Sequence, residues 1–87
     1  MSVAYIICDS ACQDYASQQY TAMYYRRTHS IGIRHRGGAT ALSFGGKGAS
    51  AISEAGMRRL ADQAMQKLDG GEDKKDVLTW ALQAARA

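Results

Sequence analysis

Two consecutive glycines, Gly37 and Gly38, separate two short segments in which apolar residues alternate with polar or small ones. A Gly-Gly pair supplies the two positive φ angles of a type I′ turn, and the side chains of a strand alternate between the faces of a sheet. Residues 30–36 and 39–44 are therefore predicted to form a β-hairpin. Pairing across a two-residue turn places four large apolar side chains on one face: Ile31, Ile33, Leu42 and Phe44.

The other face of this hairpin is predicted to be basic. The same turn sets Arg34 opposite Ala41 and Arg36 opposite Ala39, so each arginine stands beside a small side chain. A shift of one residue would move every apolar side chain to this face. The agreement between turn chemistry and apolar alternation therefore supports the predicted register.

Residues 20–27 are predicted to add a neighbouring strand, because aromatic residues and threonine favour strands. A helix that continues to Tyr25 is the alternative. A strand that turns at residues 29–30 sets Tyr25 opposite Arg34. In that arrangement the basic face gains Met23, Tyr25 and Arg27, and the apolar face gains Ala22 and Tyr24.

The N-terminal segment gives one clear signal and one ambiguous one. Residues 3–8 (VAYIIC) are apolar and rich in β-branched side chains, which predicts a buried strand that ends at Asp9. Ser10 and Gln13 are spaced as in a capping box, and apolar residues follow at helical spacing. The sequence therefore leaves helix and strand open over residues 10–27.

Residues 50–87 show helical periodicity in two segments, which Gly70 and Gly71 separate. Ser50 or Ser53 is predicted to cap a first helix that runs to about Asp69, and Asp73 to cap a second. The first helix has an apolar stripe of Met57, Leu60, Ala61, Ala64, Met65 and Leu68, with Arg58, Arg59, Asp62, Gln66 and Lys67 outside. The second has an inner stripe of Val77, Leu78, Ala81 and Ala85, with Trp80 near its edge.

These elements predict an α+β fold, in which an antiparallel β-sheet of three or four strands is packed on one face by two C-terminal helices. With 87 residues, positions 1–87 are expected to form a single domain. No apolar run is long enough for a membrane span, and the first residues lack the features of a signal peptide, so a cytoplasmic location is expected. No cofactor or metal is expected, since the spacing of Cys8, Cys12, His29 and His35 departs from that of Cys2His2 zinc sites.

Basic residues are concentrated in the middle of the chain. No acidic residue occurs between Asp14 and Glu54, whereas the rest of the chain is net negative although the total charge is +3. A one-sided basic field on a small domain is the usual footprint of a polyanionic or acidic partner. The candidate binding residues are Tyr25, Arg27, Arg34, Arg36 and Lys47.

The leading functional hypothesis is a small non-enzymatic module that contacts nucleic acid or a nucleoprotein complex through the basic sheet face. Catalysis is not expected, because the sequence does not group a nucleophile with a base and an orienting acid. The alternative is a protein-protein interaction module or inhibitor that binds an acidic protein surface or homodimerises. In its small size and lack of a catalytic motif, the chain resembles the inhibitors that phages use against host defence, such as anti-CRISPR proteins.

Overall fold

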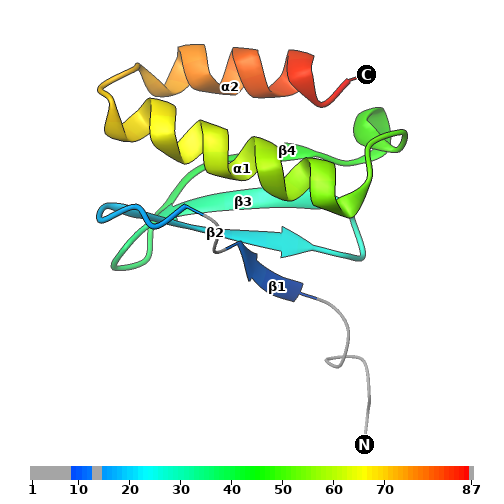
Figure 1. The fold of residues 1–87 in the computed structure, drawn as a ribbon, viewed down its shortest axis with the longest axis horizontal. Coiled ribbons are helices and arrows are strands. Elements are labelled where there is room, and N and C mark those ends of the chain that lie inside the picture. The colour runs from blue at the N-terminus through cyan, green and yellow to red at the C-terminus, as the bar shows by residue number, and fades with distance from the viewer. Residues whose placement is uncertain (1–8, 13–14, 87) are drawn as a thin grey trace, which may run out of the picture.

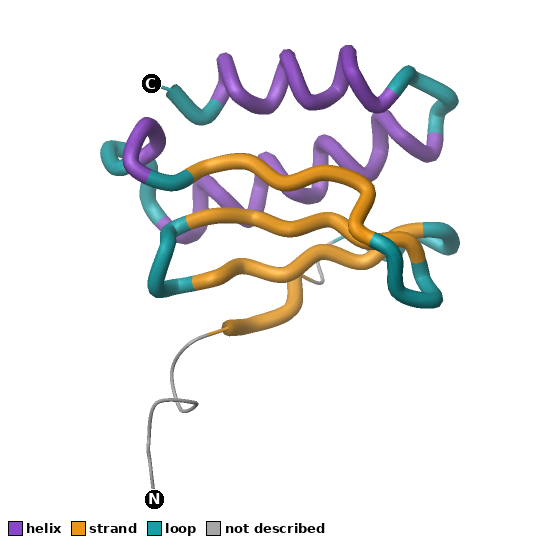
Figure 2. The backbone as a smooth tube through the Cα atoms, turned by 180° about the vertical axis from the view of Figure 1, so that it is seen from behind, coloured by secondary structure: helices purple, strands orange, loops and turns teal. Residues whose placement is uncertain are grey.

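The computed structural model of the protein describes residues 9–12 and 15–86. The elements in chain order are strands β1 (Asp9–Cys12), β2 (Tyr20–Tyr25), β3 (Ser30–His35) and β4 (Thr40–Gly45), the short 3-10 helix η2 (Lys47–Ala49), and helices α1 (Glu54–Asp69) and α2 (Lys74–Ala84). The strands form one antiparallel sheet in the order β1-β2-β3-β4. Both helices lie on the same face of this sheet (Figures 1 and 2). The predicted α+β fold is therefore confirmed.

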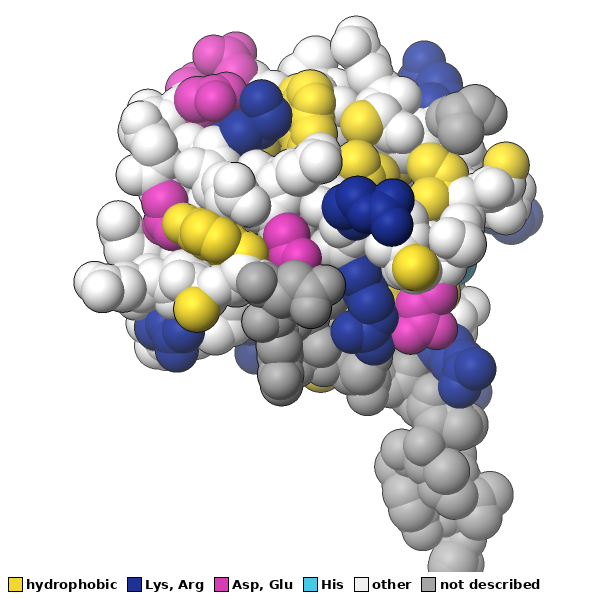
Figure 3. Space-filling view, viewed as in Figure 1, with side chains coloured by type: hydrophobic (Ala, Val, Ile, Leu, Met, Phe, Trp, Pro, Cys, Tyr) yellow, Lys and Arg dark blue, Asp and Glu magenta, His cyan; other side chains and the backbone are white. Residues whose placement is uncertain are grey.

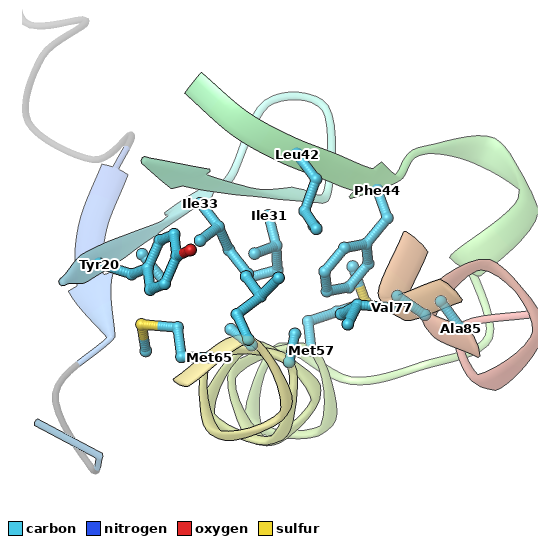
Figure 4. Packing of buried hydrophobic residues seen from close by; sticks show 14 of the residues in the cluster. Tyr20, Ile31, Ile33, Leu42, Phe44, Met57, Met65, Val77 and Ala85 are labelled. Atoms are coloured by element: carbon cyan, nitrogen blue, oxygen red, sulfur yellow. The ribbon is translucent and has the colours of Figure 1, made fainter. Parts of the chain in front are cut away.

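The hydrophobic core lies between the sheet and the two helices. Figure 4 shows the side chains that meet there, which include Ile31, Ile33, Leu42 and Phe44 from the sheet, Met57 and Met65 from α1, and Val77 from α2. Ile31, Ile33 and Val77 have no exposed area. The apolar face predicted for the hairpin and the apolar stripes predicted for the helices thus bury one another.

Strand β2 confirms the strand predicted for residues 20–27, although it ends at Tyr25, and the alternative helix is wrong. Ala22 and Tyr24 are buried in the core. Met23 and Tyr25 alternate with them and lie on the opposite face of the sheet, as predicted.

The turn between β2 and β3 is longer than predicted. Tyr25 pairs with Ser30 instead of Arg34, so the register differs by four residues. Because four is an even number, every side chain of β2 keeps its predicted face. The chain turns through residues 26–29, and Arg27 therefore lies beyond the end of β2 and not on the sheet face.

The hairpin of β3 and β4 is confirmed, and its first half has the predicted pairs, Ile31 with Phe44 and Ile33 with Leu42. The register changes after Ile33, where Arg34 pairs with Thr40 instead of Ala41. This irregularity has the form of a β-bulge, in which one strand carries an extra residue. The apolar face is unaffected, because the change lies beyond its last pair.

A longer turn accounts for the bulge. The amide of His35 donates to the carbonyl of Ala39 over 2.8 Å, so three residues, 36–38, form the loop instead of two. The predicted pairing of Arg36 with Ala39 is therefore wrong. Gly37 and Gly38 nevertheless both have positive φ angles, as the sequence required.

Strand β1 changes the interpretation of the N-terminal segment. The strand predicted for residues 3–8 lies outside the described residues. Asp9 does not end a strand, because it lies in β1 and pairs with Tyr25 of the antiparallel strand β2. The helix considered from Ser10 is therefore wrong, because ladder hydrogen bonds to β2 outweigh a local cap. Residues 15–19 have no regular secondary structure.

Helix α1 begins and ends where the sequence predicts. The Oγ atom of Ser53 accepts a hydrogen bond from the Gly56 amide at 3.0 Å, which identifies Ser53, and not Ser50, as the N-cap. Gly70 follows the last turn. Asp62, predicted to lie outside, is only 7% exposed. Helix α1 contacts β1 as well as β2 and β3. The buried surface of α1 is therefore wider than its apolar stripe, which accounts for the burial of Asp62.

Helix α2 packs on β4 and α1. Asp73 occupies the N-cap position as predicted, but its side chain makes no capping hydrogen bond. Trp80 is half-buried at the edge of the apolar stripe, with the Lys67 Nζ atom 4.9 Å from its ring centroid. Leu82 is 45% exposed. No helix of the described residues has the length and apolar character needed to cross a membrane.

Candidate functional site

One face of the sheet is covered by neither helix (Figures 1 and 2). The positions of the two central strands on this face are Thr21, Met23 and Tyr25 on β2 and Ser30, Gly32 and Arg34 on β3. Two of the five predicted binding residues, Tyr25 and Arg34, therefore share one open surface. Apart from Met23, which is half-buried, the other side chains on this face are short.

Tyr25 lies across the neighbouring strand. A Cβ atom built on Gly32 would stand 2.8 Å from Cε2 of Tyr25 and 3.4 Å from its hydroxyl oxygen. Gly32 is buried although no helix covers it, because the tyrosine ring takes the space above it. The ring is half-buried, and the described residues offer its hydroxyl no hydrogen bond. The Cε2 edge of the ring thus stands over β3.

Arg34 follows two positions after Gly32 on the same face of β3. This spacing corresponds to about 7 Å along a strand. Its neighbours across the sheet are Thr21 and Thr40. Arg34 is exposed, and it forms no ion pair or hydrogen bond with any described residue. Its guanidinium is therefore available to a ligand on this face.

Arg27 and Lys47 are twenty positions apart in the sequence but lie at the same end of the sheet. The amide of Gly46 donates to the carbonyl of His29 over 2.9 Å, which joins the β2–β3 turn to the segment that contains η2. Both cations are exposed, and neither pairs with an acid among the described residues. The predicted residues Arg34, Tyr25, Arg27 and Lys47 thus follow one another from the open face to this end.

His29 holds the same end together through its ring. Its Nε2 atom lies 2.6 Å from the carbonyl oxygen of Ile52, and its Nδ1 atom lies 2.6 Å from the hydroxyl of Tyr24. A carbonyl only accepts, so Nε2 carries a proton and donates. The histidine therefore links β2 to the segment before α1, and its backbone has a left-handed φ of 53°.

Arg36, the fifth predicted binding residue, lies at the other end of β3 and has a structural contact. Its Nε and Nη2 atoms donate to the carbonyl oxygen of Ser17 at 3.1 Å and 2.7 Å. Its amide also donates to the carbonyl of Gln19 over 2.9 Å. The guanidinium thus holds the irregular segment before β2, and the structure does not bring it together with Arg27 and Lys47.

Asp69 anchors the same irregular segment from the end of α1. Its Oδ2 atom accepts from the Tyr15 hydroxyl at 2.6 Å, and its Oδ1 atom accepts from Ser17 Oγ at 3.0 Å. The hydrogen bond to the Asp69 carboxylate, with smaller effects of burial and of the negative charge, raises the pKa of Tyr15. Residues 15–17 are thus fixed to the helix layer.

Basic residues are in excess at the end of the molecule that holds the β2–β3 turn and η2, whereas the connection between the helices carries four acidic residues beside Lys67, Lys74 and Lys75. The acidic residues of the connection between the helices lie together: Asp69, Glu72, Asp73 and Asp76. Figure 3 shows acidic side chains gathered where α1 meets α2, and more basic side chains on the opposite half of this view. The basic end contains the β2–β3 turn, η2 and the C-terminal end of α2.

Arg86 belongs to this basic end and was missed as a site residue. It lines a shallow hollow together with Gly45, Gly48, Ala49, Leu82 and Ala85. In the sequence, Arg86 appears only as a cation that suits the C-terminus of a helix. No local signal brings it beside residues 45–49, because that contact depends on the packing of α2 against β4.

The two histidines cannot hold the same metal ion. They stand at opposite ends of β3, which separates them by roughly 20 Å. Within the part of the chain that the structure describes, no group of three or more metal-binding side chains occurs.

No family model, curated protein or solved structure matches this chain. The geometry and charge of the surface described above are therefore the basis for a functional proposal.

Proposed function

We propose that the protein is a non-catalytic module that binds nucleic acid. The proposed surface runs from Arg34 on the open sheet face, past Tyr25, to Arg27 and Lys47 at the end of the sheet. The observation that carries this proposal is that three exposed cations lie along one path and have no acidic partner among the described residues. Such cations are suited to the phosphates of a nucleic-acid backbone.

The surroundings of the histidines also favour binding over catalysis. A general base needs a ring nitrogen within reach of a substrate proton. Both ring nitrogens of His29 lie within hydrogen-bond distance of groups of the fold itself, Tyr24 and Ile52. His35 lies with its ring centroid 5.0 Å from that of Tyr20. These contacts give the two side chains structural roles.

Salt dependence provides a quantitative test. Contacts to about three phosphates imply an affinity that falls roughly 20- to 40-fold between about 50 and 200 mM salt. We would titrate the protein into labelled single- and double-stranded DNA and RNA and measure fluorescence anisotropy. The double variant Arg27→Glu/Lys47→Glu is expected to bind at least about tenfold more weakly and to flatten the salt slope by about 2.

A matched control has the same change of charge at the other end of the molecule. Lys74→Glu/Lys75→Glu alters the first turn of α2, far from the β2–β3 turn (Figure 1). This variant is expected to keep the wild-type salt slope. Equal losses in both double variants would mean that binding follows net charge and not the proposed surface. The absence of binding even at about 50 mM salt would reject the proposal.

Protein binding is a second candidate function, favoured by the hollow beside α2. Leu82 is 45% exposed there and stands beside Arg86. An apolar side chain next to a cation suits a protein surface that offers an apolar residue next to an acidic one, or a second copy of the chain. Light scattering tests the second case, because a dimer that dissociates in Leu82→Asp would support it.

A further inference from the structure

We propose that the nucleic acid bound by this surface is single-stranded, and that one of its bases stacks on the ring of Tyr25. This inference rests on the proposed function and specifies its ligand. It is carried by the position of the tyrosine ring on Gly32, and not by charge alone.

The ring is held with its Cε2 edge over Gly32, so neither of its flat faces lies on the strand. A tyrosine on a strand ordinarily stands away from the sheet. Here the outer atoms of the ring occupy the place of the missing side chain of Gly32, with Cε2 2.8 Å and Cζ 3.6 Å from an ideal Cβ position. The glycine therefore allows the ring to rest on β3, and the strand supports it from below.

The surroundings of the ring suit a base and a phosphate backbone. Met23 stands opposite Gly32 on β2 and is half-buried, and Ser43 stands opposite Gly32 on β4 and is exposed. The positions of β3 and β4 beside the ring on this face, Gly32 and Ser43, carry no large side chain. Arg34 follows Gly32 along β3, and Arg27 lies in the turn that follows Tyr25, so the strand positions place a cation toward each end of the ring for the phosphates beside a stacked base.

A double helix cannot make this contact. Its bases are stacked on one another and present only their edges in the grooves. An unpaired base has an accessible π-face, and aromatic side chains on open sheets bind it with little regard to sequence. A duplex would therefore use only the cations of the surface, whereas a single strand would use the cations and the ring.

Three substitutions separate the ring from the charges. Tyr25→Ala removes the ring, and Tyr25→Phe keeps it without the hydroxyl. Gly32→Ala changes neither the tyrosine nor any charge, but its new methyl group would stand 2.8 Å from Cε2 of Tyr25 and displace the ring from β3. Gly32 has no positive φ, so alanine is compatible with its backbone. Circular dichroism and a thermal melt would show that each variant is folded.

The measurement is anisotropy at one salt concentration with single-stranded and double-stranded oligonucleotides of the same sequence. Tyr25→Ala is expected to weaken single-strand binding roughly 5- to 100-fold. Gly32→Ala should weaken it in the same direction, Tyr25→Phe should bind like the wild type, and duplex binding should change less than about twofold in all three. An oligonucleotide without bases should bind wild type and Tyr25→Ala equally.

The outcomes distinguish this inference from the proposed function. If Tyr25→Ala lowers the affinities for single strand and duplex by the same factor, or changes neither affinity, stacking is rejected. The proposal of a charge-dependent nucleic-acid surface would still hold. If Gly32→Ala binds single strands like the wild type, the ring orientation on which the inference depends is rejected. If no nucleic acid binds at low salt, both proposals are wrong.

Discussion

Arg34 and Arg36 stand two residues apart in the sequence, yet their guanidinium groups have different surroundings. Arg36 donates two hydrogen bonds to the Ser17 carbonyl. Arg34 contacts no acid or hydrogen-bond acceptor among the described residues. The sequence pattern predicted the same binding role for both residues. Charge and alternation do not reveal whether a backbone carbonyl lies close enough to accept a hydrogen bond from one of the two side chains.

This difference predicts opposite effects on stability and binding. Arg36→Ala is expected to lower the free energy of unfolding by about 1 kcal/mol, since the Ser17 carbonyl loses its charged donor. Arg34→Ala is the matched control and should change it by less than about 0.5 kcal/mol. Chemical denaturation measures both. For nucleic-acid binding we expect the opposite order, with a larger loss of affinity in Arg34→Ala than in Arg36→Ala. Equal losses of stability in the two variants would contradict the structural role of Arg36.

Among the elements, the junction between β4 and η2 is the connection that depends most on one residue. Gly45 ends β4 with a φ of 113°. A Cβ atom there would lie 2.8 Å from the carbonyl oxygen of His29 and 2.8 Å from Cα of Ser30. Both are backbone atoms at the start of β3 and cannot turn aside. The closeness of the chains at this point is what brings Lys47 to the β2–β3 turn.

We therefore predict that Gly45→Ala lowers the free energy of unfolding by about 2–4 kcal/mol, through backbone strain and displacement of β3. Gly48→Ala is the matched control in the same segment, because its Cβ atom would meet nothing within 4 Å and its φ is not positive. Its stability should be unchanged or slightly higher. Thermal unfolding of the two variants tests the prediction, and similar melting temperatures would disprove it.

Elements with strong local signals were predicted correctly from the sequence. The Gly37-Gly38 pair, the alternation around it and the Ser53 cap each act within a few residues. The errors concern properties that depend on distant contacts. The turn of residues 26–29 is closed by hydrogen bonds to residues 46 and 52, and β1 forms because β2 offers it an edge. Neither cause is present in the local sequence.

For the molecule as a whole, the basic stretch of the sequence becomes a path over the sheet and around one of its ends. The structure brings together Arg27, Arg34, Tyr25 and Lys47 along this path and separates Arg36 from it. Arg86 follows α2 and lies at the basic end, beside residues 45–49. The start of α2 has no net charge, because Asp73 and Asp76 balance Lys74 and Lys75. The distribution of charge along the sequence locates the basic stretch. It does not indicate Arg86, which lies at the basic end only because α2 packs against β4.

Strands β2, β3 and β4 and both long helices share one core, which predicts cooperative unfolding. Trp80 lies in α2, whereas far-UV circular dichroism reports sheet and helices together. In a small domain with one core, these two signals are expected to show the same transition. Ile33 is fully buried at the centre of the sheet, so Ile33→Ala should destabilise the protein by about 2–4 kcal/mol and shift both transitions equally.

The exposed Leu82 provides the control for this prediction, since Leu82→Ala removes a side chain of similar size from the surface and should change stability by less than about 0.5 kcal/mol. A fluorescence transition that stays in place while the circular dichroism transition moves would show that α2 unfolds separately from the sheet. In that case Arg86 would leave the basic end before the sheet face was lost. Coincident transitions would instead mean that the proposed binding surface exists only in the fully folded molecule, because its cations come from β3, the β2–β3 turn and η2 together.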